Sequence, residues 1–287
     1  MAGGIVHWDD VQPVRRDEGH LSAAWRYLGR AAGSDKVTVN RIEIDPNRWS
    51  TPSHVEGEEI VFVLAGSGQS WQDGTVYEVR QGDCIVYGAG REAHALRAGD
   101  DGLDVLVYGR DGYEREQETA GEPEVGEPAE RPPNIVNVEA LEPDDEGDRD
   151  LADTAGSTEA GLHHRTMVPG TPLTPAHCHS AEEEIFVMLE GTARLELIPS
   201  PVPASRGVKA ETHELGPGHV VCRPPGTKVS HFFRPGDDGA TMLVYGTREP
   251  NDIAYYPRSN KFYIRGIGLI GRLEALDYWD GEPEPPG

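Results

Sequence analysis

The chain contains the same short pattern twice. Residues 51–66 read TPSHVEGEEIVFVLAG, and residues 174–191 read TPAHCHSAEEEIFVMLEG. A repeat at this distance indicates an internal duplication, so we expect two units of one kind. The full length of 287 residues is enough for two ordinary domains, each with its own core.

The segment between the two copies predicts where the units divide. Residues 114–133, EREQETAGEPEVGEPAERPP, are rich in Glu, Pro and Gly and offer almost nothing apolar to bury, which is typical of a linker. We therefore expect an N-terminal domain at 1–113, this acidic linker, a C-terminal domain at 134–250, and a tail at 251–287.

Short apolar segments predict an all-β fold in both halves. They are rich in β-branched and aromatic residues and are separated by Gly or Asp turn signals. The expected strands are 37–44, 60–64, 75–79, 84–87 and 103–108 in the first half, and 162–168, 185–189, 193–198, 219–222, 231–233 and 242–245 in the second. Such a series of short strands indicates a sandwich or a barrel.

Three other segments give weaker signals. Residues 21–28 have the best helical periodicity in the chain, so a helix is expected there. The acidic stretch 142–153 predicts a solvated loop. The insertion 199–210, PSPVPASRGVKA, predicts a loop at the rim of a barrel.

Three histidines and a glutamate in the second half suggest a metal site. His177 and His179 are separated by two positions, so in a strand their side chains point to the same face, while Cys178 points away. Glu184 opens the next apolar run, which is expected to end in a turn at Gly191, and His231 follows a Gly-Pro turn. Imidazole and carboxylate ligands suit a first-row divalent ion, with Fe, Mn, Ni and Zn as alternatives.

This spacing resembles the motifs of the cupin superfamily. His-x-His, four residues, Glu, six residues and Gly is similar to the first cupin motif, and Gly218 through Pro225 and Gly226 to His231 is similar to the second. The resemblance implies two jelly-roll barrels in tandem, a bicupin, with one metal ion per chain held by the four residues His177, His179, Glu184 and His231. Phe186, Met188 and Phe233 would then line the cavity beside the ion.

The N-terminal copy of the motif is incomplete. Matching the TPxH segments puts His54 at the place of His177 and Glu56 at that of His179, whereas matching backwards from Glu59 puts His54 at the place of His179. Either alignment loses one ligand histidine. The second motif recurs as Gly82 leading to His94, but its turn is one residue shorter. We expect a degenerate or empty site, and weak binding by His54, Glu56, Glu59 and His94 is the alternative.

The tail after residue 250 is rich in tyrosine. Its YYPxSxK segment resembles tails of uncharacterised bacterial cupin-superfamily proteins, for which no reaction is implied. The simpler interpretation is that its aromatic side chains cap a barrel end or an interface. A sharper one is that Tyr255, Tyr256 or Lys261 reaches a bound ligand. His163 and His164 are adjacent, so only one of them can face the cavity.

Composition limits the partners. The net charge of −24 opposes nucleic acid and anionic membranes, so neither is expected. The start of the chain lacks the features of a secretory signal, no segment has the apolar length of a membrane span, and three cysteines are too few for a disulfide framework. We expect a cytoplasmic protein with a small-molecule ligand, and a homodimer stays open.

Two classes of function fit these observations. The leading hypothesis is a metal-dependent enzyme for a small oxygenated or aromatic compound, either dioxygenase-like or a decarboxylase, isomerase or hydrolase. Its catalytic acid and base are left unassigned. The alternative is a metal-containing module that binds or senses a small molecule without chemistry, which the incomplete first site favours. A storage or scaffold role is a third class, and the complete second ligand set argues against it.

Overall fold

The structure is a computed structural model that describes residues 4–50, 53–55, 57–90, 93–110, 115–117, 122–274, 276 and 279–283, with the backbone alone at 53–55, 110 and 115–117. It consists mainly of antiparallel strands, so the predicted all-β class is confirmed. The helices are single turns, namely α1 (Leu28–Ala31), α2 (Leu151–Thr154), α3 (Pro201–Ser205), η1 (Trp8–Asp10), η2 (Val138–Ala140) and η3 (Arg265–Ile267). Within the described residues, no helix could cross a membrane.

One sheet contains the strands of the first half together with β11, which follows the predicted linker. In chain order they are β2 (Val14–Glu18), β3 (Leu21–Tyr27), β4 (Val37–Ile44), β5 (Ser53–Val55), β6 (Glu59–Gln72), β7 (Thr75–Arg80), β8 (Asp83–Tyr87), β9 (His94–Arg110), β10 (Arg115–Gln117) and β11 (Ile135–Asn137). The main order is β11-β8-β6-β9-β4-β3-β2. Inward-facing residues such as Trp25, Val63 and Val105 form its core.

The second half repeats this arrangement. Its sheet contains β1 (Ile5–His7), β12 (Asp148–Asp150), β13 (Ala160–Met167), β15 (Glu184–Pro199), β16 (Glu211–Leu215), β17 (His219–Arg223) and β18 (Val229–Thr247). The order is β1-β17-β15-β18-β13-β12, with β16 paired to β15. Phe186, Met188, Phe233 and Met242 fill the core of this half.

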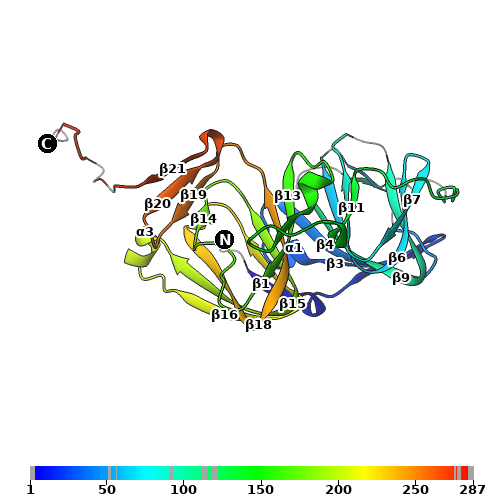
Figure 1. Ribbon diagram of the computed structural model, residues 1–287, viewed down its shortest axis with the longest axis horizontal. Helices are drawn as coiled ribbons and strands as arrows, with labels where there is room; N and C mark the ends of the chain where they lie inside the picture. Colours follow the sequence, from blue (N-terminus) through cyan, green and yellow to red (C-terminus); the bar gives the residue numbers. More distant parts are fainter. Residues whose placement is uncertain are drawn as a thin grey trace.

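A third, smaller sheet joins the tail to the second half. It has the order β14 (Cys178–His179), β19 (Ile253–Tyr256), β20 (Lys261–Ile264) and β21 (Leu269–Arg272). In Figure 1 it lies at the end of the molecule farthest from β7 and β9. Because β14 carries His179, the tail is hydrogen-bonded to the strand that presents a predicted metal ligand.

Gly191 does not lie in a turn, contrary to the expectation. β15 continues through it with register shifts between Met188 and Ala193. Gly191 has φ +68°, and a Cβ there would come 2.2 Å from the carbonyl oxygen of Gly239. Gly66 in β6 also has a positive φ, and a Cβ there would come 2.2 Å from the carbonyl oxygen of Gly102. Each glycine bends its long strand, so that the two ends of the strand pair in different parts of the sheet.

The helix expected at residues 21–28 is wrong. Residues Leu21–Tyr27 form β3, which pairs with β2 on one side and β4 on the other. Pairing on both sides and burial of Ala23 and Trp25 override the weak local helical pattern. Helical backbone begins only at Leu28.

The acidic stretch 142–153 is only partly a solvated loop. It contains β12 and the start of α2, and Leu151 and Ala152 are fully buried. The insertion contains α3, and its described residues after Ser200 are mostly exposed, as expected for a rim. Arg131, near the end of the predicted linker, forms an ion pair with buried Asp83 at 2.7 Å.

Strands are exchanged between the two halves. β1 pairs with β17 of the second half, and β11 pairs with β8 of the first half. A shared core lies between the halves, where Tyr108 stacks on Tyr245 with ring centroids 5.0 Å apart. The division into 1–113, 114–133, 134–250 and 251–287 stays a prediction, and strand pairing crosses it in both directions.

Two buried glutamates also form hydrogen bonds to the opposite half, in a reciprocal way. Glu183 accepts hydrogen bonds from the backbone N–H groups of Asp35 at 3.0 Å and Lys36 at 2.6 Å. Glu58 accepts from the backbone N–H of Thr158 at 2.9 Å and from the hydroxyl of Ser157. Each glutamate directly precedes the glutamate of its own motif, so the duplication extends to this contact.

Candidate metal centre

Backbone pairing brings the four predicted ligands into one place. His177 and His231 form a bridge, in which the N–H of His231 donates to the oxygen of His177 at 2.9 Å. His179 ends β14, and its carbonyl accepts from the N–H of Gly226, in the turn that leads to His231, at 2.8 Å. Glu184 begins β15.

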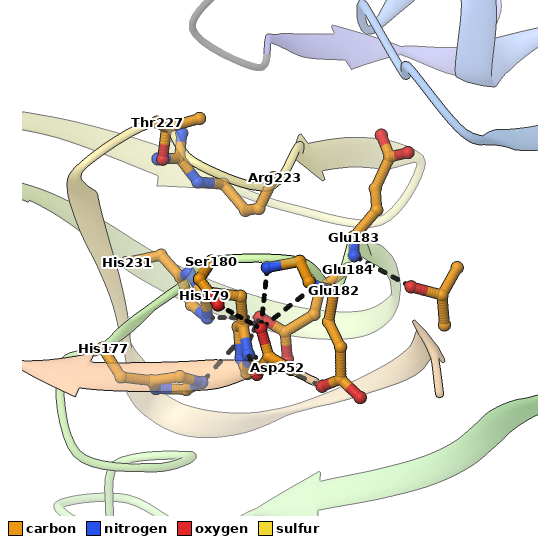
Figure 2. A network of polar contacts seen from close by, with 12 residues as sticks. His177, His179, Ser180, Glu182, Glu183, Glu184, Arg223, Thr227, His231 and Asp252 are labelled. Carbon is orange, nitrogen blue, oxygen red and sulfur yellow. Dashed lines mark hydrogen bonds and ion pairs between the residues drawn. The ribbon is translucent and has the colours of Figure 1, made fainter. Parts of the chain in front are cut away.

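The side chains converge on one atom. Oε2 of Glu184 lies 3.8 Å from Nε2 of His177, 3.2 Å from Nε2 of His179 and 3.1 Å from Nε2 of His231. All four side chains are largely buried, the most exposed being Glu184 at 14%. Figure 2 shows the three imidazole rings turned towards this carboxylate. Three nitrogens and one oxygen therefore face one another in a space of a few ångströms.

The other ring nitrogen of two histidines is fixed by a hydrogen bond. Nδ1–H of His177 donates to the carbonyl of Pro175 at 2.8 Å, and Nδ1–H of His179 donates to Oδ2 of Asp252 at 2.6 Å. In the neutral ring that a metal requires, a proton on Nδ1 leaves Nε2 with a lone pair directed at Glu184. Metal-binding histidines are held in this way by carbonyls and carboxylates behind them.

Asp252 is the residue that sequence reasoning missed here. Its side chain is 1% exposed, and its Oδ1 accepts from the N–H of Ala181 at 2.8 Å and of Glu182 at 3.1 Å, while Oδ2 holds His179. Burial raises the pKa of Asp252, but these hydrogen bonds, with that of His179 foremost, lower it to about 2. No local motif marks this aspartate, since it comes from the tail through the pairing of β14 with β19.

The charges of the cluster show that it favours a cation. Burial alone would raise the pKa of Glu184, but His179 and His231 hold it well below its usual range. Burial lowers the pKa of His179, yet Glu184 and Asp252 outweigh this and raise it to about 11. Burial lowers the pKa of His231 to about 4, so this ring is neutral. Without a metal, a proton on His179 therefore balances the buried Glu184 carboxylate, and a metal cation would take the place of that proton.

The donor set fits a divalent ion. Nε2 of His179, Nε2 of His231 and Oε2 of Glu184 are buried and, among the described residues, none has a hydrogen bond of acceptable geometry. Candidate ligand atoms of His177, His179 and Glu184 lie within 4.8 Å of one another. Nitrogen and oxygen donors in this number suit Mn, Fe, Ni or Zn.

A neighbouring cluster of His179, Glu182 and Asp252 also has metal-like spacing. Its carboxylates already have other partners, however. Glu182 pairs with Arg265 at 2.5 Å and accepts from the N–H of Glu249 at 3.2 Å. This second cluster therefore supports His179 from behind and is not a second ion site.

The candidate centre opens into a cavity of about 380 Å³. Phe186 lines it, as predicted, but Met188 and Phe233 lie in the core behind. The tail contributes Tyr256, whose ring stacks on His177 at 5.5 Å, together with Tyr263 and Arg265.

The tail tyrosines have different roles. The hydroxyl of Tyr255 donates to Asn260 at 3.2 Å, away from the centre, and Nζ of Lys261 lies 4.7 Å from the ring of Tyr256. Burial raises the pKa of Tyr256, and Glu184 adds to this rise. Only Tyr256 of the three residues named from the sequence lines the cavity.

Comparison with known proteins agrees with the geometry. A family model described as the cupin domain matches residues 40–108, which is less than half of the chain. No curated protein matches. The fold of the chain resembles that of two-barrel cupins. Bacillus subtilis oxalate decarboxylase, studied for its Mn(II) centres, is 17% identical over 88% of this chain and 79% of its own, with a TM-score of 0.64.

A second solved structure gives the same result. Lactobacillus farciminis oxalate decarboxylase, in a formate complex, is 15% identical over 86% of this chain and 87% of its own, with a TM-score of 0.65. At such identities the likeness shows the fold alone. The predicted resemblance to two-barrel cupins is thereby confirmed.

The N-terminal half of the chain has a different site. Nε2 of His94 lies 3.1 Å from Oε1 of Glu59, and the ring of Tyr87 stacks on His94 at 3.8 Å. Tyr87 is paired with Glu59 in the way that Arg223 is paired with Glu184. The side chain of His54 and the whole of Glu56 lie outside the described residues, so the expectation of a degenerate site stays a prediction.

Proposed function

We propose that this bicupin is a metal-dependent enzyme acting on a small carboxylate or related oxygenated compound, with His177, His179, Glu184 and His231 holding one divalent transition ion. The observation that carries the proposal is the convergence of three imidazole Nε2 atoms on Oε2 of Glu184. Neutral imidazole nitrogens and a carboxylate oxygen that face one another in the interior repel unless a proton or a metal cation lies between them.

The residues around the centre support catalysis over storage of an ion. Four protein ligands leave open positions on an ion that prefers six, and open positions distinguish catalytic from structural sites. A divalent ion there would act as a Lewis acid on a bound oxygen. Phe186, Tyr256 and Tyr263 would shield that oxygen from bulk water, and Asp252 would keep His179 in the binding tautomer.

The substrate class is taken from chemistry and from the relatives together. Three arginines, Arg165, Arg248 and Arg265, line the cavity although the chain as a whole is strongly acidic. Asp148, Glu182 and Glu184 line the cavity too, so it favours an anionic ligand once it holds a divalent ion. The solved relatives are named as oxalate decarboxylases, one of them with formate, which favours decarboxylation of a small carboxylic acid over the other reactions considered.

Metal content tests the proposal first. Elemental analysis of the freshly purified protein should find close to one transition ion per chain. The H179A variant should lose most of it because one of four ligands is removed. The exposed His213 provides the matched control, since H213A should bind metal as the wild type does. Equal losses in H179A and H54A would instead show that the first half also binds metal.

Turnover tests it second. The metal-loaded protein should convert at least one member of a panel of small carboxylic acids, enols and phenols, and chelation should abolish this activity. A fully loaded protein with neither turnover nor metal-dependent ligand binding would overturn the proposal.

The N-terminal half favours a second candidate, ligand binding without chemistry. Its cavity of about 260 Å³ is lined by Tyr77, Tyr87, His94 and Asn134, and Tyr87 covers the histidine that a metal would need. Small-molecule binding that persists in H179A after chelation would support this role. The homodimer and the cytoplasmic location stay predictions.

A further inference from the structure

His163 faces the cavity of the candidate metal centre, whereas His164 points away from it. His164 stacks on Phe62 of the other half at 6.4 Å. His163 lines the cavity, and its Nδ1–H donates to Oδ2 of Asp148 at 2.8 Å. This bond holds the ring in place and leaves Nε2 on the side away from Asp148.

Nε2 of His163 lies over Gly161. A Cβ placed on Gly161 would come 3.3 Å from this nitrogen, and 3.7 Å from Nη2 of Arg248. Gly161 pairs with Gly246 of β18, and Gly246 pairs on its other side with Glu184 of β15. Residues opposite each other on neighbouring strands point to the same face of a sheet. Glu184, Gly246 and Gly161 therefore form one row, with Nε2 of His163 above its far end.

The middle of this row is open. Neighbouring strands are about 4.8 Å apart, so the backbones of Glu184 and Gly161 are separated by about 10 Å. Gly246 has no side chain, and a Cβ there would meet no atom within 4 Å. The space above Gly246 accommodates a ligand only a few atoms long, between the metal ligands and His163.

The charges around this space favour an anion. Asp148 and Asp150 of β12 face His163, as do Arg165 of β13 and Arg248 after β18. The hydrogen bond to Asp148 raises the pKa of His163, and burial opposes this rise without cancelling it. The arginines have carboxylate partners, Arg165 with Glu146 and Arg248 with Asp153. In its protonated form, His163 keeps Nδ1–H on Asp148 and has Nε2–H as a second donor on the side of Gly161.

We propose, building on the metal-dependent function above, that the space over Gly246 is the substrate seat. It holds a small carboxylate with one oxygen at the metal and the other accepting a hydrogen bond from Nε2–H of His163. Asp148 is a positioning residue that holds this imidazole. The chain thus contributes a contact at each end of the ligand, and the width of the row limits the ligand to a short acid.

Three variants test the seat. H163N keeps an amide where Nδ1 donates to Asp148 but lacks Nε2. G246A places a methyl group in the seat without touching a neighbour. G216A is the matched control. Its added Cβ also meets nothing within 4 Å, but Gly216 lies between β16 and β17, outside the seat. The probe is oxalate, titrated by calorimetry into wild-type and variant proteins that are first loaded with Co(II), whose absorption spectrum reports ligation.

We expect the variants to differ in their affinity for oxalate and not in their affinity for Co(II). All four proteins should bind Co(II) equally. Oxalate should bind H163N and G246A about 10-fold to 100-fold more weakly than wild type, the loss expected for a charge-assisted hydrogen bond or a blocked seat. G216A should match wild type. Oxalate affinity should also fall as pH rises through the pKa of His163 in wild type and stay flat in H163N.

Contrary results have distinct meanings. Equal oxalate affinity in wild type, H163N and G246A would overturn the seat while leaving the metal function intact. Wild-type protein that binds Co(II) but neither oxalate nor acetate would overturn the carboxylate class of ligand. Failure of the wild type to bind Co(II) would overturn the proposed function and the seat together.

Discussion

At the scale of single residues, Asp252 determines the tautomer and the orientation of the His179 ring. Its two oxygens have separate tasks, since Oδ1 accepts from two backbone N–H groups and Oδ2 accepts from His179. An asparagine at this position would keep its oxygen on the backbone side and turn its amide N–H₂ towards Nδ1. The imidazole would then have to accept there, which moves its own proton to Nε2 and removes the lone pair that a metal needs.

We therefore expect D252N to keep the fold and lose the metal. Affinity for Mn(II) or Co(II), measured by competition with a chelator, should fall about 10-fold to 100-fold. The thermal midpoint of the chelated protein should change little, whereas D252A should lose stability as well, because two backbone donors lose their acceptor. Unchanged metal affinity in D252N would show that His179 does not depend on this bond.

His163 gives the molecule a pH-dependent contribution to stability. Its ordinary pKa is 6.5 and the folded value is raised, first by the hydrogen bond to Asp148. A raised folded pKa stabilises the fold fully below the unfolded value and loses this contribution as pH rises through the folded value. In urea titrations with a chelator present, wild type should exceed H163N in unfolding free energy at about pH 6, and the difference should shrink by about pH 9. A difference independent of pH would contradict this.

The candidate ligands could be predicted from sequence, and their supporting residues could not. His177, His179, Glu184 and His231 lie on adjoining strands and turns, so their spacing carries the information, and the structure brings them together. Asp252 and Asp148 reach the site through β19 and β12, and pairing between distant strands leaves no local pattern. The same reason explains Gly191, because a bulge and a turn have the same sequence signal until the partner strand is known.

At the scale of elements, the long bent strands β6 and β15 shape the two halves. Each is paired along both of its parts, and each bends at a glycine with positive φ. The bend lets β15 present Glu184 at one end while its other end pairs with β16. The site therefore depends on a backbone conformation several residues away from any ligand.

Substitution of Gly191 should cost considerable stability. In G191A the left-handed backbone alone costs about 1–2 kcal/mol, and the methyl group would also press on the oxygen of Gly239. The thermal midpoint should fall by several degrees, and metal affinity should fall with it as Glu184 shifts. G216A serves as the control with no strain. Equal stability of the two variants would refute the role assigned to the bend.

At the scale of the whole molecule, the two halves form a single packed unit. Their shared core contains residues of both halves, and Glu58 and Glu183 each cap backbone of the opposite half. Glu183 also precedes Glu184 directly, so the contact between the halves adjoins the candidate metal centre. We infer that local changes in one half alter the stability of the other.

The variant E183A tests this cooperation. Two partly buried N–H groups would lose their acceptor, at a cost of at most about 1–3 kcal/mol for each donor left unpaired. Unfolding, followed by both tryptophan fluorescence and circular dichroism, should shift to lower denaturant as one transition. E214A, at an exposed glutamate, should leave the midpoint unchanged. Two separate transitions in E183A would show that the halves fold independently.

Because β1 and β11 each pair with a strand of the other half, noncovalent contacts should hold the two halves together even after the chain is cut. A protease that cut between residues 122 and 130 would leave β1 on one fragment, bound to β17 on the other, and β11 bound in the opposite sense to β8. The nicked protein should elute at its original size from a gel-filtration column and come apart only in denaturant. Conversely, two separately expressed fragments should associate, because each supplies a strand that the sheet of the other lacks.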